Sequence, residues 1–150
     1  MTTTSPSRTP ICALCHDLNY LVERGPHWTL ALNLNQSLPG KCVLVLNRHA
    51  EDVRELAVEE WSDLHVQIAR TTAALDALFD PDLYNYAFLM NQDAHVHLHV
   101  VPRYSSRREW RSERFVDPHF GGLFGTEQRQ LSWEALEDLR DAIRERLPDA

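Results

Sequence analysis

Alternating and continuous apolar runs predict several strands in the first ninety residues. Residues 28–34 alternate between apolar and smaller or polar side chains, and this period of two is typical of a strand. Ser-Leu-Pro-Gly at positions 37–40 indicates a turn, and the apolar run at 42–46 predicts a second strand antiparallel to the first. The aromatic-rich segment 84–90 predicts a further strand.

Two helices are predicted from helical periodicity. Apolar residues between positions 58 and 79 recur at three-, four- and seven-residue steps, which is typical of an amphipathic helix: Trp61, Leu64, Ile68, Leu75 and Leu78. Asp80-Pro81 should end this helix, because the residue before proline disfavours helical backbone. Ser132 is a suitable N-cap for a final helix that runs to Leu147.

Residues 95–103 carry the most unusual pattern, because histidine alternates three times with an aliphatic residue. On a strand this period places His95, His97 and His99 on one face and the aliphatic residues on the other. The short link at 91–94 suits a hairpin with the preceding strand.

A row of imidazoles has a limited range of chemistry. Alternate residues on a strand are ~6.7 Å apart, so the outer two histidines are ~13 Å apart and one metal would not take all three. Neutral imidazole is a nucleophile at pH 7, and a hydrogen bond to its second nitrogen selects the tautomer. The flanked position of His97 therefore favours covalent catalysis; the alternative is a solvated strand face without chemistry.

The cysteines indicate a metal site. An odd number, three, in a chain without an export signal predicts reduced thiols. Cys12 and Cys15 have the spacing of a zinc knuckle, and His49 and His95 would complete a Cys2His2 site, with His16 as a rival ligand. The alternatives are a pair of half-buried cysteines or a redox pair, which would require a preceding strand. Cys42 is expected in the core.

Composition narrows the class of protein. The 150 residues are 43% hydrophobic, enough for one domain, which we expect to span residues 11–150. Residues 1–10 are Ser/Thr-rich and lack the apolar stretch of a secretory signal, which predicts a disordered tail on a cytoplasmic protein. No apolar run is long enough for a membrane span. The formal net charge of −7 argues against duplex nucleic acid as a partner.

The run His95–Val101 is a full match to the His-φ-His-φ-His-φ-φ signature, where φ is apolar, and the chain resembles the histidine-triad (HIT) family. Residues 33–40, 43–46 and 48–49 look like the strand pair on the nucleotide side in that family. The resemblance implies an α+β fold, with an antiparallel sheet of about five strands, one long helix and a C-terminal helix. It also implies a homodimer.

The same resemblance implies an activity. It is hydrolysis or transfer at the α-phosphate of a nucleoside phosphate derivative: a dinucleoside polyphosphate, a phosphoramidate or an adenylate. His97 would form a nucleotidyl-histidine that releases a nucleoside monophosphate. His99 would hold the phosphoryl oxygens or protonate the leaving group, and His95 would orient the site. Two alternatives are a zinc-hydroxide phosphoesterase using His49, His95 and His97, and a non-catalytic nucleotide-binding module.

Further site residues follow from the family pattern. Asn33 stands where the family contacts ribose, and Asn91 is the candidate for the phosphate or leaving group. Many family members bind zinc through such a knuckle and two histidines, which implies structural zinc at Cys12, Cys15, His49 and His95 and no organic cofactor. Lys41 replaces a histidine that is frequent in the family; its ammonium would meet a phosphate or face solvent, and the sequence does not choose between the two.

The segment after the histidines leaves two interpretations open. Arg103 or Arg107 would suit polyphosphate, because arginine donates two parallel hydrogen bonds to phosphate oxygens. The alternative is that the arginine-rich stretch 103–114 is a solvated segment of mixed charge. Residues 115–124, aromatic and interrupted by glycine, are expected to form a lid, a base-stacking loop or a subunit contact.

Overall fold

The computed structural model describes residues 12–16 and 18–150, so the tail predicted for residues 1–10 lies outside the described residues. The strands are β1 (Leu21–Arg24), β2 (Trp28–Leu32), β3 (Cys42–Leu46), β4 (Leu83–Ala87), β5 (His97–Arg103), β6 (Arg108–Trp110) and β7 (Glu113–Phe115). The helices are α1 (Ala13–His16), α2 (Val58–Phe79) and α3 (Trp133–Arg146), with a 3-10 turn η1 at Val53–Glu55. Among these described helices, none has the length and apolar character needed to cross a bilayer.

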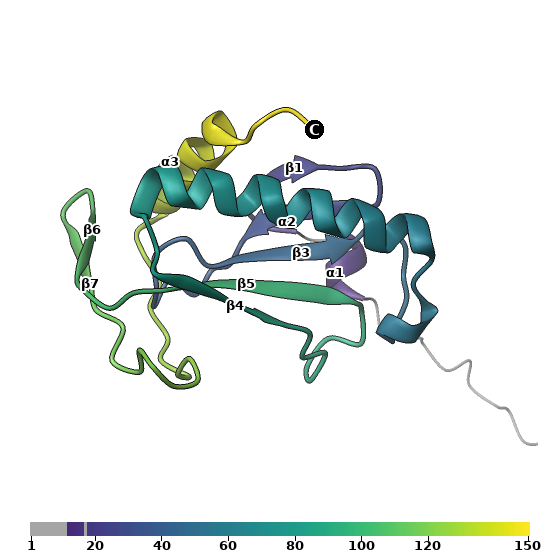
Figure 1. The fold of residues 1–150 in the computed structure, drawn as a ribbon, viewed down its shortest axis with the longest axis horizontal. Helices are drawn as coiled ribbons and strands as arrows, with labels where there is room; N and C mark the ends of the chain where they lie inside the picture. The colour runs from purple at the N-terminus through teal and green to yellow at the C-terminus, as the bar shows by residue number, and fades with distance from the viewer. Residues whose placement is uncertain (1–11, 17) are drawn as a thin grey trace, which may run out of the picture.

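Five of the strands form one antiparallel sheet in the order β1-β2-β3-β5-β4. Helix α2 runs along one face of this sheet and α3 lies beside it toward β1, while the hairpin β6–β7 extends from one end (Figure 1). The predicted α+β fold, with five strands, one long helix and a C-terminal helix, is confirmed.

Strand register assigns each residue to a face of the sheet. Leu44 of β3 lies opposite Leu30 on one side and Leu98 on the other, and all three are buried in the core beneath the helices. Side chains alternate along a strand, so the neighbours Val43 and Val45 face away from the helices. The helix-free face therefore receives the histidines, because they pair with these two valines.

Helix α2 has the bounds that the sequence predicts. It begins at Val58 and ends at Phe79, and Asp80 closes it in a left-handed conformation with φ of 46°. The indole of Trp28 donates a hydrogen bond of 2.8 Å to the carbonyl of Glu60, which joins the start of α2 to the middle of the sheet. For α3, the hydroxyl of Ser132 accepts from the backbone N–H of Ala135 at 3.2 Å, as an N-cap does.

Several elements differ from the prediction. Strand β1 and the hairpin β6–β7 were not expected, since strands of four and three residues are too short for a period to emerge. Strand β4 ends at Ala87 rather than at residue 90, where Met90 adopts a φ of +43°. Strand β5 begins at His97, so His95 lies just before it.

The turn between β2 and β3 is held by a buried glutamine. The side chain of Gln36 donates to the carbonyls of Asn33 and Lys41, and it accepts from the N–H of Gly40 at 2.9 Å. Gly40 has a φ of +89°, a conformation that favours glycine. These hydrogen bonds fix the backbone of the turn up to Lys41, the residue just before β3.

We predict that Gly40→Ala destabilises the protein more than Gly121→Ala does. Both glycines have positive φ, so each substitution incurs the left-handed penalty of roughly 1–2 kcal/mol. A Cβ at position 40 would also lie 2.8 Å from Cδ2 of buried Leu75, whereas a Cβ at 121 meets nothing within 4 Å. Overpacking should add about 1 kcal/mol or more at position 40. Urea unfolding of both variants measures the difference, and equal losses would contradict the packing argument.

Candidate active site and metal centre

A cavity of about 390 Å³ opens on the helix-free face of the sheet. His97 and His99 line it from β5, Lys41 from the position just before β3, and Asn33 from the position just after β2. The loop after β4 and the segment before α3 complete the wall, with Leu89, Asn91, Gln92, Asp93, Phe124, Gly125, Thr126 and Gln128. The predicted residues His97, His99, Asn33 and Asn91 thus meet at one cavity.

His97 is held in one tautomer by its own backbone. Its Nδ1 lies 2.7 Å from the carbonyl oxygen of His95, a buried contact in which the ring nitrogen is the donor. Nε2 is consequently without a proton in the neutral ring and available as a nucleophile. Only 7% of the residue is exposed, although it lines the cavity. The contact of Nδ1 with the carbonyl of His95 is the hydrogen bond expected for the ring nitrogen that does not react.

His99 stands beside His97, with the two ring centroids 4.9 Å apart. Burial, together with the nearby His97 and Lys41, lowers the pKa of His99 to about 4. The free site therefore holds a neutral His99 near pH 7. An anionic ligand beside it would favour the protonated form and raise this pKa.

The two asparagines reach the cavity from different sides of β5, since Asn33 follows β2 and Asn91 follows β4. The side-chain oxygen of Asn33 accepts from the N–H of Asn35 at 2.9 Å, which leaves the amide NH₂ group of Asn33 able to donate. Asn91 is exposed, one residue after the strained Met90. Asn35 in turn donates to the carbonyl of Glu127, and so links the β2–β3 turn to the wall formed by residues 124–128.

Arg103 does not reach the cavity, which corrects its expected role in phosphate binding. It is 1% exposed, and its guanidinium makes five hydrogen bonds to protein groups: Asp117 twice, Asn85, and the carbonyls of His119 and Gly122. A guanidinium has five N–H donors, so none is left for a ligand.

The role of Arg103 is to organise the loop after β7. Burial opposes ionisation of Asp117, but hydrogen bonds from Arg103 and from the backbones of Tyr104 and His119 outweigh it and keep the pKa of Asp117 below its ordinary value. Arg107, the other candidate, lies on the solvated segment, where its side chain is 58% exposed and 3.7 Å from Glu109.

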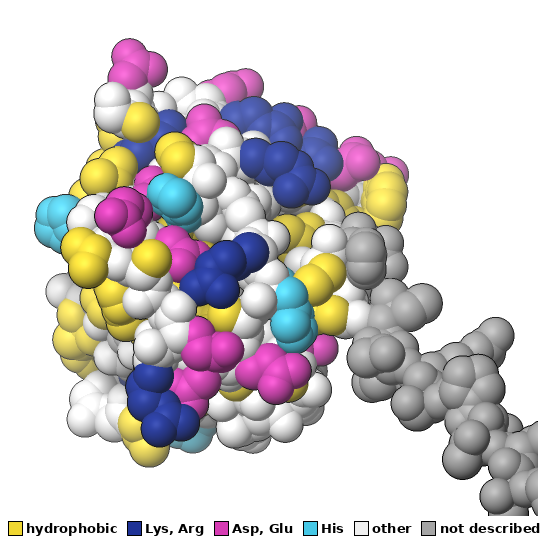
Figure 2. Space-filling view, turned by 90° about the vertical axis from the view of Figure 1, so that its right-hand side faces the viewer, with side chains coloured by type: hydrophobic (Ala, Val, Ile, Leu, Met, Phe, Trp, Pro, Cys, Tyr) yellow, Lys and Arg dark blue, Asp and Glu magenta, His cyan; other side chains and the backbone are white. Residues whose placement is uncertain are grey.

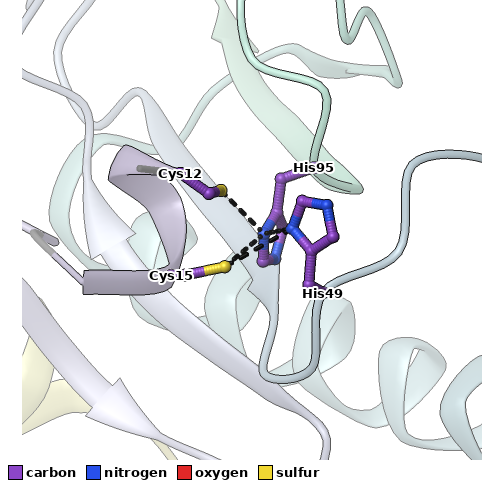
Figure 3. Close-up of side chains that lie close together, drawn as sticks. All are labelled: Cys12, Cys15, His49 and His95. Carbon is purple, nitrogen blue, oxygen red and sulfur yellow. Dashed lines mark hydrogen bonds between the residues drawn. The ribbon is translucent and has the colours of Figure 1, made fainter. Parts of the chain in front are cut away.

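Four side chains converge on one point from the segment around α1, the loop after β3 and the segment just before β5 (Figure 3): Cys12, Cys15, His49 and His95. Nδ1 of His95 lies 3.3 Å from each sulfur, and Nδ1 of His49 lies 3.4 Å from Sγ of Cys15. The two Nδ1 atoms are 3.2 Å apart. Tetrahedral zinc with bonds of about 2.0–2.3 Å would separate its ligands by roughly 3.3–3.8 Å. The four residues fit zinc.

The outer contacts also suit a metal. Nε2 of His95 lies 2.7 Å from the carbonyl oxygen of Leu46, and Nε2 of His49 lies 3.3 Å from a carboxylate oxygen of Glu51. Such partners accept a hydrogen bond from Nε2–H and leave Nδ1 directed toward the ion, as around zinc-bound histidines generally. The side chain of His16, the rival ligand, lies outside the described part of the structure. Cys42 is in the core, where burial raises the pKa of its thiol to about 12.

The cluster and the cavity share a strand but not their residues. His95 belongs to the cluster and does not line the cavity, whereas His97 lines the cavity and lies outside the cluster. A catalytic zinc ligated by His97 is therefore disfavoured by the geometry. On the face shown in Figure 2, basic side chains lie in groups between acidic ones.

Part of the cavity wall was not predicted. Phe124, Thr126 and Gln128 come from a segment without secondary structure, and no periodic or motif signal marks them. Residues 115–124 were noted only as an aromatic, glycine-interrupted stretch, of which Phe124 reaches the cavity. Hydrogen bonds between Asn35 and the backbone at positions 127 and 129 bring this segment to the site.

Comparisons with known proteins give matches in sequence and in fold. The sequence model of the family described as HIT domain matches residues 19–106. A bis(5'-adenosyl)-triphosphatase of Dictyostelium discoideum is 30% identical over 77 residues, which are 48% of this chain and 52% of the relative, so the match spans about half the length of that protein.

Solved structures share the fold. A histidine triad protein of Sinorhizobium meliloti superposes with a TM-score of 0.69 at 21% identity, covering 85% of this chain and 88% of the other. A zinc-bound histidine triad protein of Mycobacterium smegmatis gives a TM-score of 0.59 at 17% identity, covering 84% of each chain.

We predict about one zinc ion per chain after purification without chelators, and loss of that zinc in Cys15→Ser, because a thiolate ligand is removed. Cys42→Ala should retain the metal, since this thiol lies in the core and outside the cluster. Elemental analysis of the three proteins measures the content. Substoichiometric metal in the parent protein, or unchanged zinc in Cys15→Ser, would contradict the assignment.

We predict that Asp117→Asn costs about 3–5 kcal/mol of unfolding free energy, because it leaves the buried charge of Arg103 without its counterion. Asp138→Asn removes the exposed partner of Arg111 and should cost at most about 1 kcal/mol. Chemical denaturation compares the two. A loss at Asp117 no larger than at Asp138 would show that the guanidinium finds other compensation.

Proposed function

Because the chain belongs to the HIT domain family, we propose that it is a nucleotide hydrolase or transferase acting at the α-phosphate of a nucleoside phosphate derivative. The observation that carries the proposal is the hydrogen bond from His97 Nδ1 to the carbonyl of His95, since it frees Nε2 at the floor of the cavity. The relative named as a bis(5'-adenosyl)-triphosphatase supports dinucleoside polyphosphates as the first substrates to test.

In the first step, Nε2 of His97 attacks the α-phosphorus. A P–N bond forms, the bond from phosphorus to the leaving group breaks, and the leaving group departs with the electron pair. The hydrogen bond from Nδ1 to the carbonyl of His95 then stabilises the positive charge that develops on the imidazole. The intermediate is a nucleotidyl-histidine.

In the second step, water attacks the same phosphorus from the side opposite His97. The P–N bond breaks, its electrons return to Nε2, and a nucleoside monophosphate leaves. The proton of the attacking water is released to solvent or to a group of the site. His99 is placed to donate a hydrogen bond to phosphoryl oxygens, and once a bound phosphate raises its pKa it can protonate the leaving group.

The asparagines would orient the nucleotide. Asn33 is the proposed donor to the ribose and Asn91 the proposed contact for the phosphate or leaving group, on the two sides of the histidines. Cys12, Cys15, His49 and His95 would hold zinc, whose chemistry here is structural because four protein ligands leave no position for substrate. The carbonyl of His95 also accepts a hydrogen bond from Nδ1–H of His97, which ties the position of the nucleophile to the cluster.

The family resemblance also supports a homodimer. Strand β4 is an edge of the sheet with exposed Leu83 and Tyr86, and an unpaired edge of this kind can pair with a second copy. Sedimentation equilibrium giving the mass of a single chain would remove this part of the proposal.

We predict that His97→Asn lowers turnover of a dinucleoside polyphosphate by at least about a thousandfold, because the nucleophile is lost. With a substrate labelled at the α-phosphate, quenching in alkaline denaturant should trap a labelled protein in the parent and not in the variant. His65→Asn, an exposed histidine of α2, should leave both readouts unchanged. Zinc content serves as the control for folding of each variant.

Each competing function has its own outcome in this experiment. Turnover without any adduct would favour zinc-hydroxide chemistry, and nucleotide binding without turnover across the substrate panel would favour a regulatory module. Unchanged turnover in His97→Asn would overturn the proposed mechanism.

A further inference from the structure

Lys41 is the only lysine of the chain; the other 14 basic residues of the 15 are arginine. It follows Gly40 and is only 7% exposed. Its backbone carbonyl accepts from the N–H of Asn33 at 3.0 Å and from the side chain of Gln36 at 2.9 Å, so its position is well defined. A single buried lysine in a protein that otherwise uses arginine calls for a physical reason.

The register of the sheet places this side chain in the cavity. Val43 lies opposite His99, and position 41 is two residues earlier on the same chain, so Lys41 faces the same side of the sheet. Lys41 and His99 both line the cavity, as does Val101 of β5. His97 is the cavity residue of β5 nearest in sequence to His95 of the metal cluster, and His99 comes next. Lys41 lies beyond His99, because Cys42 already pairs with Val100.

Among the described residues, the ammonium group of Lys41 has one hydrogen-bond partner. This is Oγ of Ser37 at 3.5 Å, the limit for such a contact. Across residues 12–16 and 18–150, no carboxylate lies within ion-pair distance of it. Burial lowers the pKa of Lys41, against the opposing effect of Glu127. Withdrawing an ammonium from water without a counterion is unfavourable.

The neighbouring carboxylates are engaged elsewhere. A second cavity of about 100 Å³ adjoins the first, and Lys41 lines both. Of its acidic residues, Asp117 is paired with Arg103, and Glu127 lies 2.5 Å from Nε2 of His119. Lys41 thus lines the cavity that contains the histidines without an ion pair to either of these carboxylates.

We propose that Lys41 is a specificity residue that binds an anionic phosphate of the ligand on the His99 side of the site. The inference rests on the proposed function in that it assumes a phosphate-bearing ligand. Pairing with a phosphate oxygen supplies the counterion that the protein lacks, and favours ligands with charge at this position over uncharged nucleosides. Lys41 thus acts with His99 on the phosphate, while Asn33 contacts the sugar.

The test compares Lys41→Met, Lys41→Arg and the parent protein, each loaded with zinc. Calorimetric affinity for adenosine 5'-monophosphate should fall by about tenfold to a hundredfold in Lys41→Met, as expected for loss of a charged hydrogen bond. Lys41→Arg should recover part of the affinity, and adenosine should bind all three proteins equally. Arg107→Met, which removes an exposed cation outside the cavity, is the matched control.

A second readout follows from the single lysine. Protein labelled with ¹³C-lysine should give one Cε resonance, and its titration should move to higher pH when adenosine monophosphate or inorganic pyrophosphate binds. An unchanged titration together with affinities within twofold in Lys41→Met would overturn the proposal. Equal loss of adenosine and monophosphate binding would also overturn it, because that result indicates a structural role.

The two proposals can fail separately. A labelled His97 adduct with unaltered nucleotide affinity in Lys41→Met removes the inference about Lys41 alone. A ligand-dependent shift of the lysine resonance without any turnover removes the hydrolase function and leaves Lys41 as a phosphate-binding residue.

Discussion

The antiparallel pairing of β3 with β5 decides where the groups of the site lie. Leu44 opposite Leu98 fixes the core face, and the alternation of side chains then directs His97, His99 and Lys41 to the face without helices. A slip of one residue would exchange these faces and bury the imidazoles beneath α2. Burial of the aliphatic residues between the histidines therefore holds the register, and the histidines are exposed to the cavity as a consequence.

Backbone carbonyls connect the metal cluster to the candidate nucleophile. The carbonyl of Leu46 faces Nε2 of His95, and the carbonyl of His95 accepts from Nδ1 of His97. The first contact directs Nδ1 of His95 toward the cysteines, and the second leaves Nε2 of His97 bare. His95 thus has two parts in the site. Its side chain belongs to the metal cluster, and its carbonyl orients His97.

Arg103 and Lys41 are both buried cations, but they differ in their hydrogen-bonding partners. Arg103 has five donors in a planar group, and the loop after β7 uses all of them in the protein interior. Lys41 is a compact charge with no such set of internal partners, at the cavity wall. An arginine that satisfies a loop is a structural residue, whereas a buried lysine without a counterion is available to a ligand.

Much of this arrangement is encoded locally. The period of two at residues 95–101, the bounds of α2, the cap at Ser132 and the spacing of Cys12 and Cys15 depend on contacts within a few residues, so they are visible in the sequence. The sequence offered His49 and His95 as partners of that knuckle and the HIT resemblance supported them; the structure brings the four ligand atoms together.

Tertiary structure alone decided the rest, because burial depends on partners far along the chain. The sequence leaves Arg103 equally suited to a phosphate or to a carboxylate, and it is the packing of the loop that contains Asp117 that removes it from the site. Likewise, the wall formed by residues 124–128 and the burial of Lys41 result from long-range contacts between segments without periodicity. Alternation determines the face on which a side chain lies, whereas its exposure and its partners are set by what packs against that face.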